Sequence, residues 1–450
     1  MKNSIIYGLI GLMGTLANLS CSDFLDRKSD VSLLVPTTLD DCQYLLNDPY
    51  SMGYYTSTGF TDVLTDDYIV TYAQWSTYYN ADAKGFYVWD GEAIPNSGRW
   101  DMYQTVYCAN CILAILDEIT PGDEQEQTRW NAIKGCALFF RAFAFYHVAQ
   151  VYAPTYDKAS ATTDWGIPLR LSAVIDDPTI RSTVQETYDR VIMDLTDAVA
   201  LLPSVALNRL MPDKAAGYAM LSRVYLMMRD YEQALTRATN SLESRNTLLD
   251  YNETTMFVRL ENPEVLFPGI SFAEALVYYY GSVHPDLYTS YADNDLRKAA
   301  YFTSNGQGGY RTGGTCSGSN SYTFTGLAVD EVYLTRAECH ARAGDKTAAL
   351  NDLNTLLRKR HDATFTDYTA ASAEEALSLI LKERRKELIF RGIRWSDIKR
   401  LNKEPEHAIT LTRTFPDNPA TYTLPPNDKR YVLLVPQEVI EKAGIPQTPR

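Results

Sequence analysis

The feature that most constrains the fold is a series of helical segments that fills the middle and the later part of the chain. Helical spacing of apolar residues recurs over 106–119, 130–151, 184–202, 215–228, 231–242, 330–343, 346–360 and 373–390. Turn residues separate these segments, among them Pro121-Gly122, Pro203, Arg229-Asp230 and Gly344-Asp345. Because this periodicity dominates, the sequence predicts a mostly α protein.

Two pairs of these segments have the spacing of tetratricopeptide-type helical hairpins. Ser222 and Ala234 flank the first turn, and Ala337 and Ala349 flank the second, 12 positions apart in both cases. Two helices that cross closely need small residues where their backbones approach. Such hairpins cannot bury their faces alone, so we expect them to stack into a slab.

Two long stretches, residues 44–103 and 252–326, are poor in helix signals and rich in aromatic or small polar residues. Long loops inside a compact domain are usually functional or disordered. We therefore expect a single domain over residues 21–450. Its helical scaffold should span about 104–250 and 328–401, and the two loop-rich insertions should form a ligand-binding face.

Composition narrows the classes of function. Hydrophobic residues make up 45% of the chain, enough for a sizeable core, and the net charge of −14 argues against nucleic-acid binding. Tyrosine is abundant, with 32 residues against 15 Phe and 6 Trp. A tyrosine ring can stack on a sugar while its hydroxyl bonds a sugar hydroxyl, although we assign most of these tyrosines to helix contacts.

The first 20 residues have the pattern of an export signal, with Lys2 before an apolar stretch that is too short for a confident membrane span. The stretch ends at Leu19-Ser20-Cys21, which is similar to a lipoprotein processing site. We expect a signal peptide over residues 1–20 and lipidation of Cys21, which would anchor the chain to a membrane. The alternative is a plain secretory signal with an unrelated cysteine.

The six remaining cysteines are expected to be packed free thiols or to include one disulfide. Cys108 and Cys111 have the spacing of a metal or redox pair, but no second pair and no nearby pair of histidines accompanies them. We expect no metal site and no cofactor.

Two arginines lie in apolar helical patterns and need partners if they are buried. Arg141 lies in the segment CALFFRAFAFY, and Arg384 lies on an apolar stripe. The candidate partners are Glu331, Glu338 and Glu387. An acid–base catalytic role is the alternative, but ion pairs beneath packed helices are normally architectural.

No motif of an enzyme stands out. The chain has 5 histidines. It lacks the GxSxG motif of serine hydrolases, the P-loop of nucleoside triphosphatases, the HExxH motif of zinc proteases and the fingerprint of dinucleotide-binding enzymes. Asp66-Asp67 is a carboxylate pair, and a glycoside hydrolase needs two carboxylates across a cleft. We expect a binding protein and not an enzyme.

The segment ERRKELIFRGIRWSDIKRL, residues 383–401, resembles the C-terminal signature of the SusD/RagB family. Further segments are similar to motifs of this family and follow in the family's order: Cys21-Ser22-Asp23-Phe24, Phe140-Arg141-Ala142, Gly166-Ile167-Pro168-Leu169, Arg181-Ser182-Thr183-Val184, Asn262-Pro263-Glu264-Val265, Asp330-Glu331-Val332-Tyr333 and Leu434-Val435-Pro436. The resemblance covers almost the whole chain.

The resemblance implies a SusD-like fold and a lipoprotein of the outer membrane that faces the exterior. It implies a surface protein that binds an oligosaccharide and delivers it to a SusC-like TonB-dependent transporter. Two alternatives stay open: a RagB-like lipoprotein that binds peptide, and a helical-repeat partner protein without a small ligand.

We expect the ligand to contact the two loop-rich regions. The candidates for stacking are Trp75, Tyr78, Tyr79 and Trp89 in the first region and Tyr279 and Tyr288 in the second. Asp66, Asp67 and Asn80 are candidates for bonding sugar hydroxyls. For each residue the alternative role is loop packing.

Overall fold

The fold is seen in a computed structural model, which describes residues 36–52, 55–56, 58–254, 257, 259–316, 318 and 321–450. The expected signal peptide and Cys21 lie outside the described residues.

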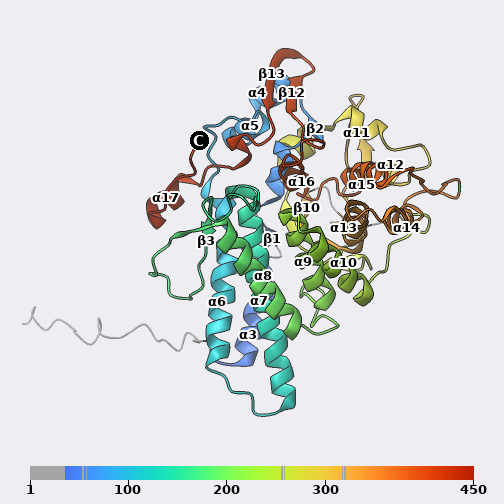
Figure 1. Cartoon of the computed structure of the whole chain (residues 1–450). Coiled ribbons are helices and arrows are strands. Elements are labelled where there is room, and N and C mark those ends of the chain that lie inside the picture. Colours follow the sequence, from blue (N-terminus) through green and yellow to red (C-terminus); the bar gives the residue numbers. More distant parts are fainter. Residues whose placement is uncertain are drawn as a thin grey trace, which may run out of the picture.

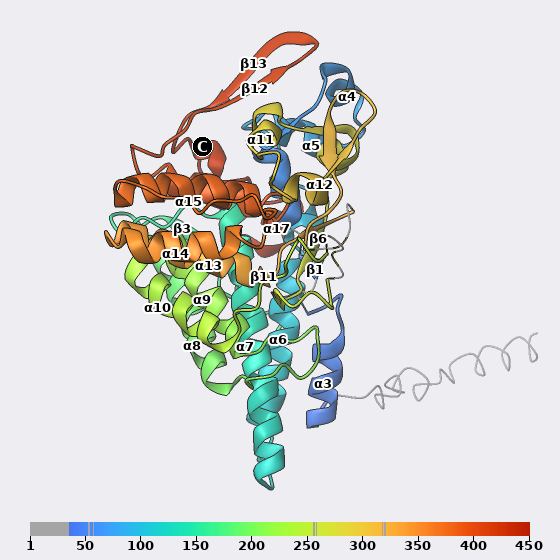
Figure 2. The ribbon, with the colours of Figure 1, turned by 90° about the vertical axis from the view of Figure 1, so that its right-hand side faces the viewer.

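Consecutive long helices form a continuous stack, as Figures 1 and 2 show. Neighbours pack in the order α6, α7, α8, α9, α10 and α13, and α14 and α15 pack against α13 and against each other. The mostly α class is therefore confirmed. The bounds are α6 Met102–Asp117, α7 Glu124–Tyr152, α8 Val184–Leu201, α9 Lys214–Met228, α10 Tyr231–Ser244, α13 Val329–Arg342, α14 Lys346–Leu357 and α15 Ala373–Glu387.

The two expected hairpins are α9–α10 and α13–α14, and the small residues that flank their turns are buried. Each turn contains a residue with a left-handed backbone, Arg229 with φ of 59° and Gly344 with φ of 83°. The next residue, Asp230 or Asp345, accepts a backbone hydrogen bond from the first turn of the following helix. Turn and cap together direct the chain back along the preceding helix.

The helix that we predicted over 373–390 is shorter than expected. It ends at Glu387, because Phe390 and Gly392 both adopt left-handed backbone conformations with φ near 60°. This break lets the chain turn into α16, Arg394–Leu401.

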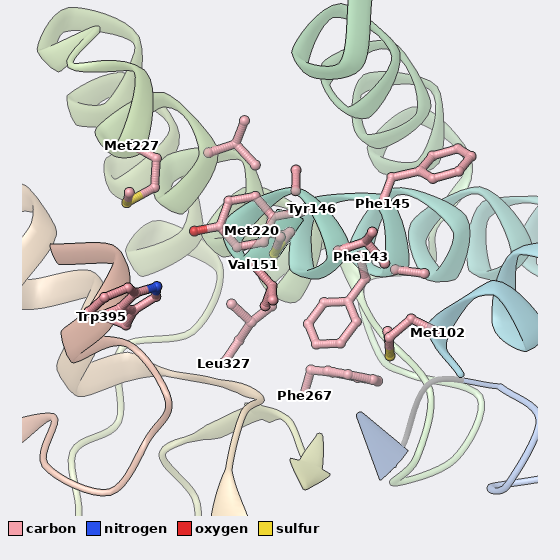
Figure 3. Close-up of a cluster of buried hydrophobic side chains, with 14 of the residues drawn as sticks. Met102, Phe143, Phe145, Tyr146, Val151, Met220, Met227, Phe267, Leu327 and Trp395 are labelled. Carbon is pink, nitrogen blue, oxygen red and sulfur yellow. The ribbon is translucent and has the colours of Figure 1, made fainter. Parts of the chain in front are cut away.

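The long helix α7 lies at the centre of the core. Figure 3 shows Phe143 and Tyr146 of α7 among side chains from neighbouring elements, including Phe267 and Trp395. In the described part of the chain, α7 is the single helix that is long and apolar enough to cross a membrane, and 94% of its apolar window is buried within the protein.

The stretches outside the stack contain short elements. Figure 2 shows α4, α5, α11 and α12 on the other side of the molecule from α8, α10 and α14. The helical elements are α3 Leu39–Asn47, η1 Thr58–Leu64, α4 Tyr72–Thr77, α5 Ala81–Tyr87, η2 Ser97–Trp100, the π-helix η3 Leu276–Tyr280, α11 Pro285–Thr289, α12 Arg297–Tyr301, η4 Lys429–Tyr431 and α17 Gln437–Ala443.

Small sheets tie these stretches together. β6 pairs with both β1 and β10, and the other pairs are β5–β11, β2–β7, β3–β4, β8–β9 and β12–β13. The bounds are β1 Tyr55–Thr56, β2 Tyr68–Ile69, β3 Trp165–Pro168, β4 Arg181–Thr183, β5 Val265–Phe267, β6 Ile270–Phe272, β7 Ser282–Val283, β8 Phe302–Ser304, β9 Tyr310–Thr312, β10 Tyr322–Phe324, β11 Leu327–Ala328, β12 Leu411–Phe415 and β13 Asn418–Leu424.

Both buried arginines are paired, but not with the carboxylates that we expected. Arg141 donates to Asp194 at 2.8 Å and to Asn110 at 2.9 Å, and Arg384 donates to Asp397 at 2.9 Å. The three glutamates that we proposed as partners bind other arginines: Glu331 pairs with Arg223, Glu338 with Arg400 and Arg342, and Glu387 with Arg297 and Arg360. Burial creates the need for a partner, whereas helix packing decides which carboxylate meets it.

The six cysteines from Cys42 onward are free thiols, so Cys108 and Cys111 form no disulfide.

Candidate functional site

A group of aromatic side chains is exposed on the loop-rich part of the molecule. We call Tyr79, Phe272, Tyr279, Tyr280 and Tyr322 the aromatic face. Four of them are strongly exposed, with 82% for Tyr79, 62% for Phe272, 51% for Tyr280 and 45% for Tyr279. Because water contact with large aromatic rings is unfavourable, a gathering of such rings at a surface is a candidate binding site.

Four contacts hold these residues in one place. The buried ring of Tyr78 lies 4.7 Å from the ring of Tyr79 and 5.7 Å from that of Tyr280, measured between ring centroids. The Tyr279 hydroxyl lies 2.7 Å from Ser321 Oγ. Ser321 directly precedes Tyr322, which pairs with Phe272 across β10 and β6. The five residues therefore belong to one continuous surface.

The π-helix η3 orients the three consecutive tyrosines. Tyr278 is buried and packs against both Tyr68 and Phe390, whereas Tyr279 and Tyr280 are exposed. π-helical turns are rare and occur frequently at functional sites.

A buried carboxyl group anchors this turn. The Tyr278 hydroxyl donates to Asp62 Oδ2 at 2.7 Å. Burial raises the pKa of Asp62 to about 7, although the hydrogen bond from Tyr278 acts in the opposite direction. The Asp62–Tyr278 contact fixes the residue that directly precedes the exposed pair, Tyr279 and Tyr280.

A second carboxylate anchors the other side of the aromatic face. Glu274 accepts a 2.7 Å hydrogen bond from the Tyr78 hydroxyl and a 2.9 Å charged hydrogen bond from Arg99. Arg311 donates to the backbone oxygen of Tyr279 at 3.1 Å. Glu274 is buried and holds Tyr78 in place, whereas Arg311 and Ser321 place polar groups beside the exposed rings, as recognition of a polyhydroxylated ligand requires.

Three of the predicted site residues meet at the aromatic face. Tyr79 and Tyr279 are exposed there, and the buried Tyr78 packs against Tyr79 and Tyr280. The prediction omitted Phe272, Tyr280 and Tyr322. The run Tyr278-Tyr279-Tyr280 was the available sequence signal for Tyr280, but the sequence does not show which of the three rings points outward.

The two predicted tryptophans have packing roles. Trp89 is buried, its Nε1 donates to Leu64 O at 2.9 Å, and the Arg413 guanidinium lies 4.9 Å from its ring centroid. Trp75 is half-buried, donates to Lys84 O at 3.0 Å and packs on Phe415 of the β12–β13 hairpin. Neither indole presents a free face comparable with that of Tyr79.

The predicted polar residues also have partners within the protein. Asp66 forms ion pairs with Arg394 at 2.8 Å and Arg385 at 3.1 Å, and these cations hold the pKa of Asp66 well below its usual range. Asp67 is buried and pairs with Arg385 at 3.0 Å. Asn80 caps α5 by accepting hydrogen bonds from two backbone N–H groups.

Tyr288 lies on a different part of the loop-rich region. Its ring stacks on that of Tyr310, with centroids 3.7 Å apart and planes 11° from parallel, and Lys298 Nζ lies 5.4 Å from the ring centroid. One face of the ring is thus covered by Tyr310.

One buried cluster has the residue types of a cation site. Glu264, Cys316 and Asp330 offer ligand atoms within 4.8 Å of one another. Arg360 binds Glu264 at 2.6 Å, and Arg391 forms a charged hydrogen bond with Asp330. The two guanidinium groups already supply the positive charge that these carboxylates need, so the cluster is a structural ion-pair network.

The comparisons with known proteins agree with this fold. A family model described as "Starch-binding associating with outer membrane" matches residues 23–226, and the model of the SusD family matches residues 310–438. Together the two models match about three quarters of the chain. The chain belongs to the SusD family.

Individual relatives are distant. SusD-like protein P2 of Formosa agariphila is 25% identical over 243 residues, which are 52% of this chain and 45% of that protein, so the match spans less than half of the relative. A putative sugar binding protein from Bacteroides vulgatus has a similar structure, with a TM-score of 0.75 and 22% identity over 92% of this chain and 99% of that one.

A laminarin binding SusD-like protein has a TM-score of 0.64 and 17% identity over 91% of this chain and 97% of that one. At these identities the two structures show a shared fold.

Proposed function

We propose that the protein is a cell-surface lipoprotein that binds an oligosaccharide and delivers it to a SusC-like TonB-dependent transporter of the outer membrane. The observation that carries the proposal is the aromatic face on the loop-rich regions 44–103 and 252–326. Exposed tyrosines beside Arg311 and Ser321 suit sugar rings, which stack through their apolar faces and bond through their hydroxyls.

The family to which the chain belongs supports a role in glycan binding at the outer membrane. The family description names starch binding and the outer membrane, and one structural neighbour is a laminarin binding protein. Within this proposal, the helical stack is the scaffold of the single domain over residues 21–450, and lipid on Cys21 holds the protein at the outer membrane, facing the exterior.

The test is affinity electrophoresis of the full chain through gels that contain neutral or acidic polysaccharides, with a peptide mixture assayed in parallel. We expect one glycan class to retard the protein. Each of Tyr79→Ala and Tyr279→Ala should weaken this retardation about threefold to tenfold, since loss of one stacked ring costs on the order of 1 kcal/mol.

The matched control is Tyr44→Ala. Tyr44 is exposed on α3, which lies at the far end of the molecule from α4 (Figure 2), so its loss should leave retardation unchanged. Binding of peptides without retardation by any glycan would contradict the proposal in favour of a RagB-like peptide binder. Binding of neither ligand, with capture of the transporter, would favour a partner protein without a small ligand.

A further inference from the structure

A cavity separate from the aromatic face is rich in cations. It has a volume of about 340 Å³ and lies among β3, β4, α16 and the C-terminal segment. Its wall includes Trp165, Arg181, Lys399, Lys403 and Asn427. We call it the Trp165 cavity. Its volume falls at the lower end of the range for small-molecule sites.

Lys399 in this cavity is a buried cation that pairs with no carboxylate of the described residues. It is 3% exposed, and its Nζ donates to Gln150 O at 2.7 Å and to Ala153 O at 3.0 Å. An ammonium group has three N–H donors, so these two carbonyls leave one donor available. Burial, followed by the nearby charge of Lys403, lowers the pKa of Lys399 to about 7.

Arg181 lies in the same wall and also bonds neutral oxygens. It donates to Gly166 O at 2.9 Å, to Tyr152 O at 3.1 Å and to Thr448 Oγ1 at 3.1 Å. No ion pair of Arg181 occurs among the described residues. Burial lowers the pKa of its guanidinium, as expected for a cation that no anion compensates.

This arrangement differs from that of the other buried cations in the described part of the chain. Apart from Lys399 and Arg413, each of them forms an ion pair with a carboxylate: Arg141, Arg223, Arg297, Arg360, Arg384, Lys386, Arg391 and Arg400. Arg413 bonds four backbone carbonyls and stacks on Tyr87 in the core. Lys399 instead borders a cavity that a ligand could enter.

The carboxylates that line the cavity, Asp164 and Asp428, are fewer than its cations. Asp157 pairs with Lys403 at 3.2 Å, and Asp428 pairs with Arg430 at 2.9 Å. Asp164 accepts a 2.6 Å hydrogen bond from Ser160. Lys429 adds a further cation to the lining. An anionic ligand group would therefore supply the charge that Lys399 and Arg181 lack.

Trp165 indicates the chemistry of the part of the ligand that is not charged. Its side chain is 42% exposed and lines the cavity, with the Arg181 guanidinium 5.6 Å from the ring centroid. An exposed indole beside cations fits a ring that is apolar on its face and carries an acid at its edge.

We propose that the Trp165 cavity binds a carboxylate-bearing sugar unit, a uronate, with its ring on Trp165 and its carboxylate near Lys399 and Lys403. The site is independent of the aromatic face, so it can exist whether or not that face binds glycan.

The test is isothermal titration of the full chain with galacturonate and glucuronate, with galactose and glucose as neutral probes. We expect uronates to bind at least tenfold more tightly than the neutral sugars. Trp165→Ala should weaken uronate binding about threefold to tenfold, and Lys403→Gln should weaken it by a similar factor. Tyr279→Ala, at the aromatic face, is the control and should leave it unchanged.

The pH dependence gives a second readout that loss of folding cannot mimic. Between pH 6 and pH 8 the affinity for uronate should fall, because Lys399 loses its proton near pH 7. The lowered pKa values of Asp157 and Asp428 and the pKa of Tyr431, raised to about 12, keep the charges of those neighbours constant over this range. Lys399→Gln should remove the dependence.

Equal binding of uronates and neutral sugars, or full uronate affinity in both Trp165→Ala and Lys403→Gln, would overturn the proposal. If none of the four sugars binds, the proposal is overturned as well.

Discussion

Among single residues, Asp62 connects stability to the geometry of the aromatic face. It is buried beneath η3 and accepts the hydrogen bond of Tyr278, and burial raises its pKa to about 7. The folded protein therefore retains a proton on Asp62 that the unfolded chain has lost above about pH 4. Folding stability linked to this group is present at low pH and is lost as the pH rises through about 7.

We expect Asp62→Asn to reduce this loss. Between pH 5 and pH 8 the wild-type free energy of unfolding should fall by on the order of 2 kcal/mol more than that of the variant. Urea unfolding at both pH values measures the difference. Parallel pH profiles of the two proteins would show that Asp62 does not carry a raised pKa.

The same scale shows why the exposed aromatic residues were only partly predictable. Tyr79 and Tyr279 could be selected because they lie in aromatic, loop-rich stretches. Trp75 lies in such a stretch too, but Phe415 packs on it from a hairpin more than 300 positions later in the sequence. Local composition reveals aromatic residues, whereas long-range packing decides which rings remain exposed.

At the scale of elements, α15 is held in place by buried ion pairs. Glu387, near its end, accepts hydrogen bonds from Arg297 at 2.9 Å and from Arg360 at 2.7 Å, and all three side chains are fully buried. These contacts join α15 to α12 and to the segment after α14. Removing one partner of a buried network leaves uncompensated charge in a medium of low polarity.

Glu387→Gln should therefore destabilise the protein by about 3–5 kcal/mol. A matched control is Glu438→Gln, which alters an exposed ion pair with Lys442 on α17 and should leave the denaturation midpoint nearly unchanged. Chemical denaturation of both variants compares them. Similar midpoints for the two variants would show that the buried pairs contribute little to stability.

Elements differ in how well the sequence predicts them. The long helices were predictable because their apolar periodicity is local, and the ends of the helices lie within six residues of those expected. The β12–β13 hairpin was missed, although burial alternates along β12, because five to seven residues give only a short pattern. The partners of Arg141 and Arg384 were missed because helix packing selects them.

On the scale of the whole molecule, the helical stack and the loop-rich side present different surfaces. The stack pairs its buried arginines with carboxylates, whereas the loop-rich side exposes the aromatic face. The Trp165 cavity lies elsewhere, beside α16. This division predicts that ligand contacts concentrate on the short elements and leave the stack unaffected.

Hydrogen–deuterium exchange of the full chain, with and without the glycan that retards it, tests this central claim most directly. The account predicts slower exchange on glycan binding around residues 72–80, 270–283 and 305–316, with exchange in α8, α9 and α10 unchanged. Slower exchange confined to the helical stack, with none in those three segments, would contradict it.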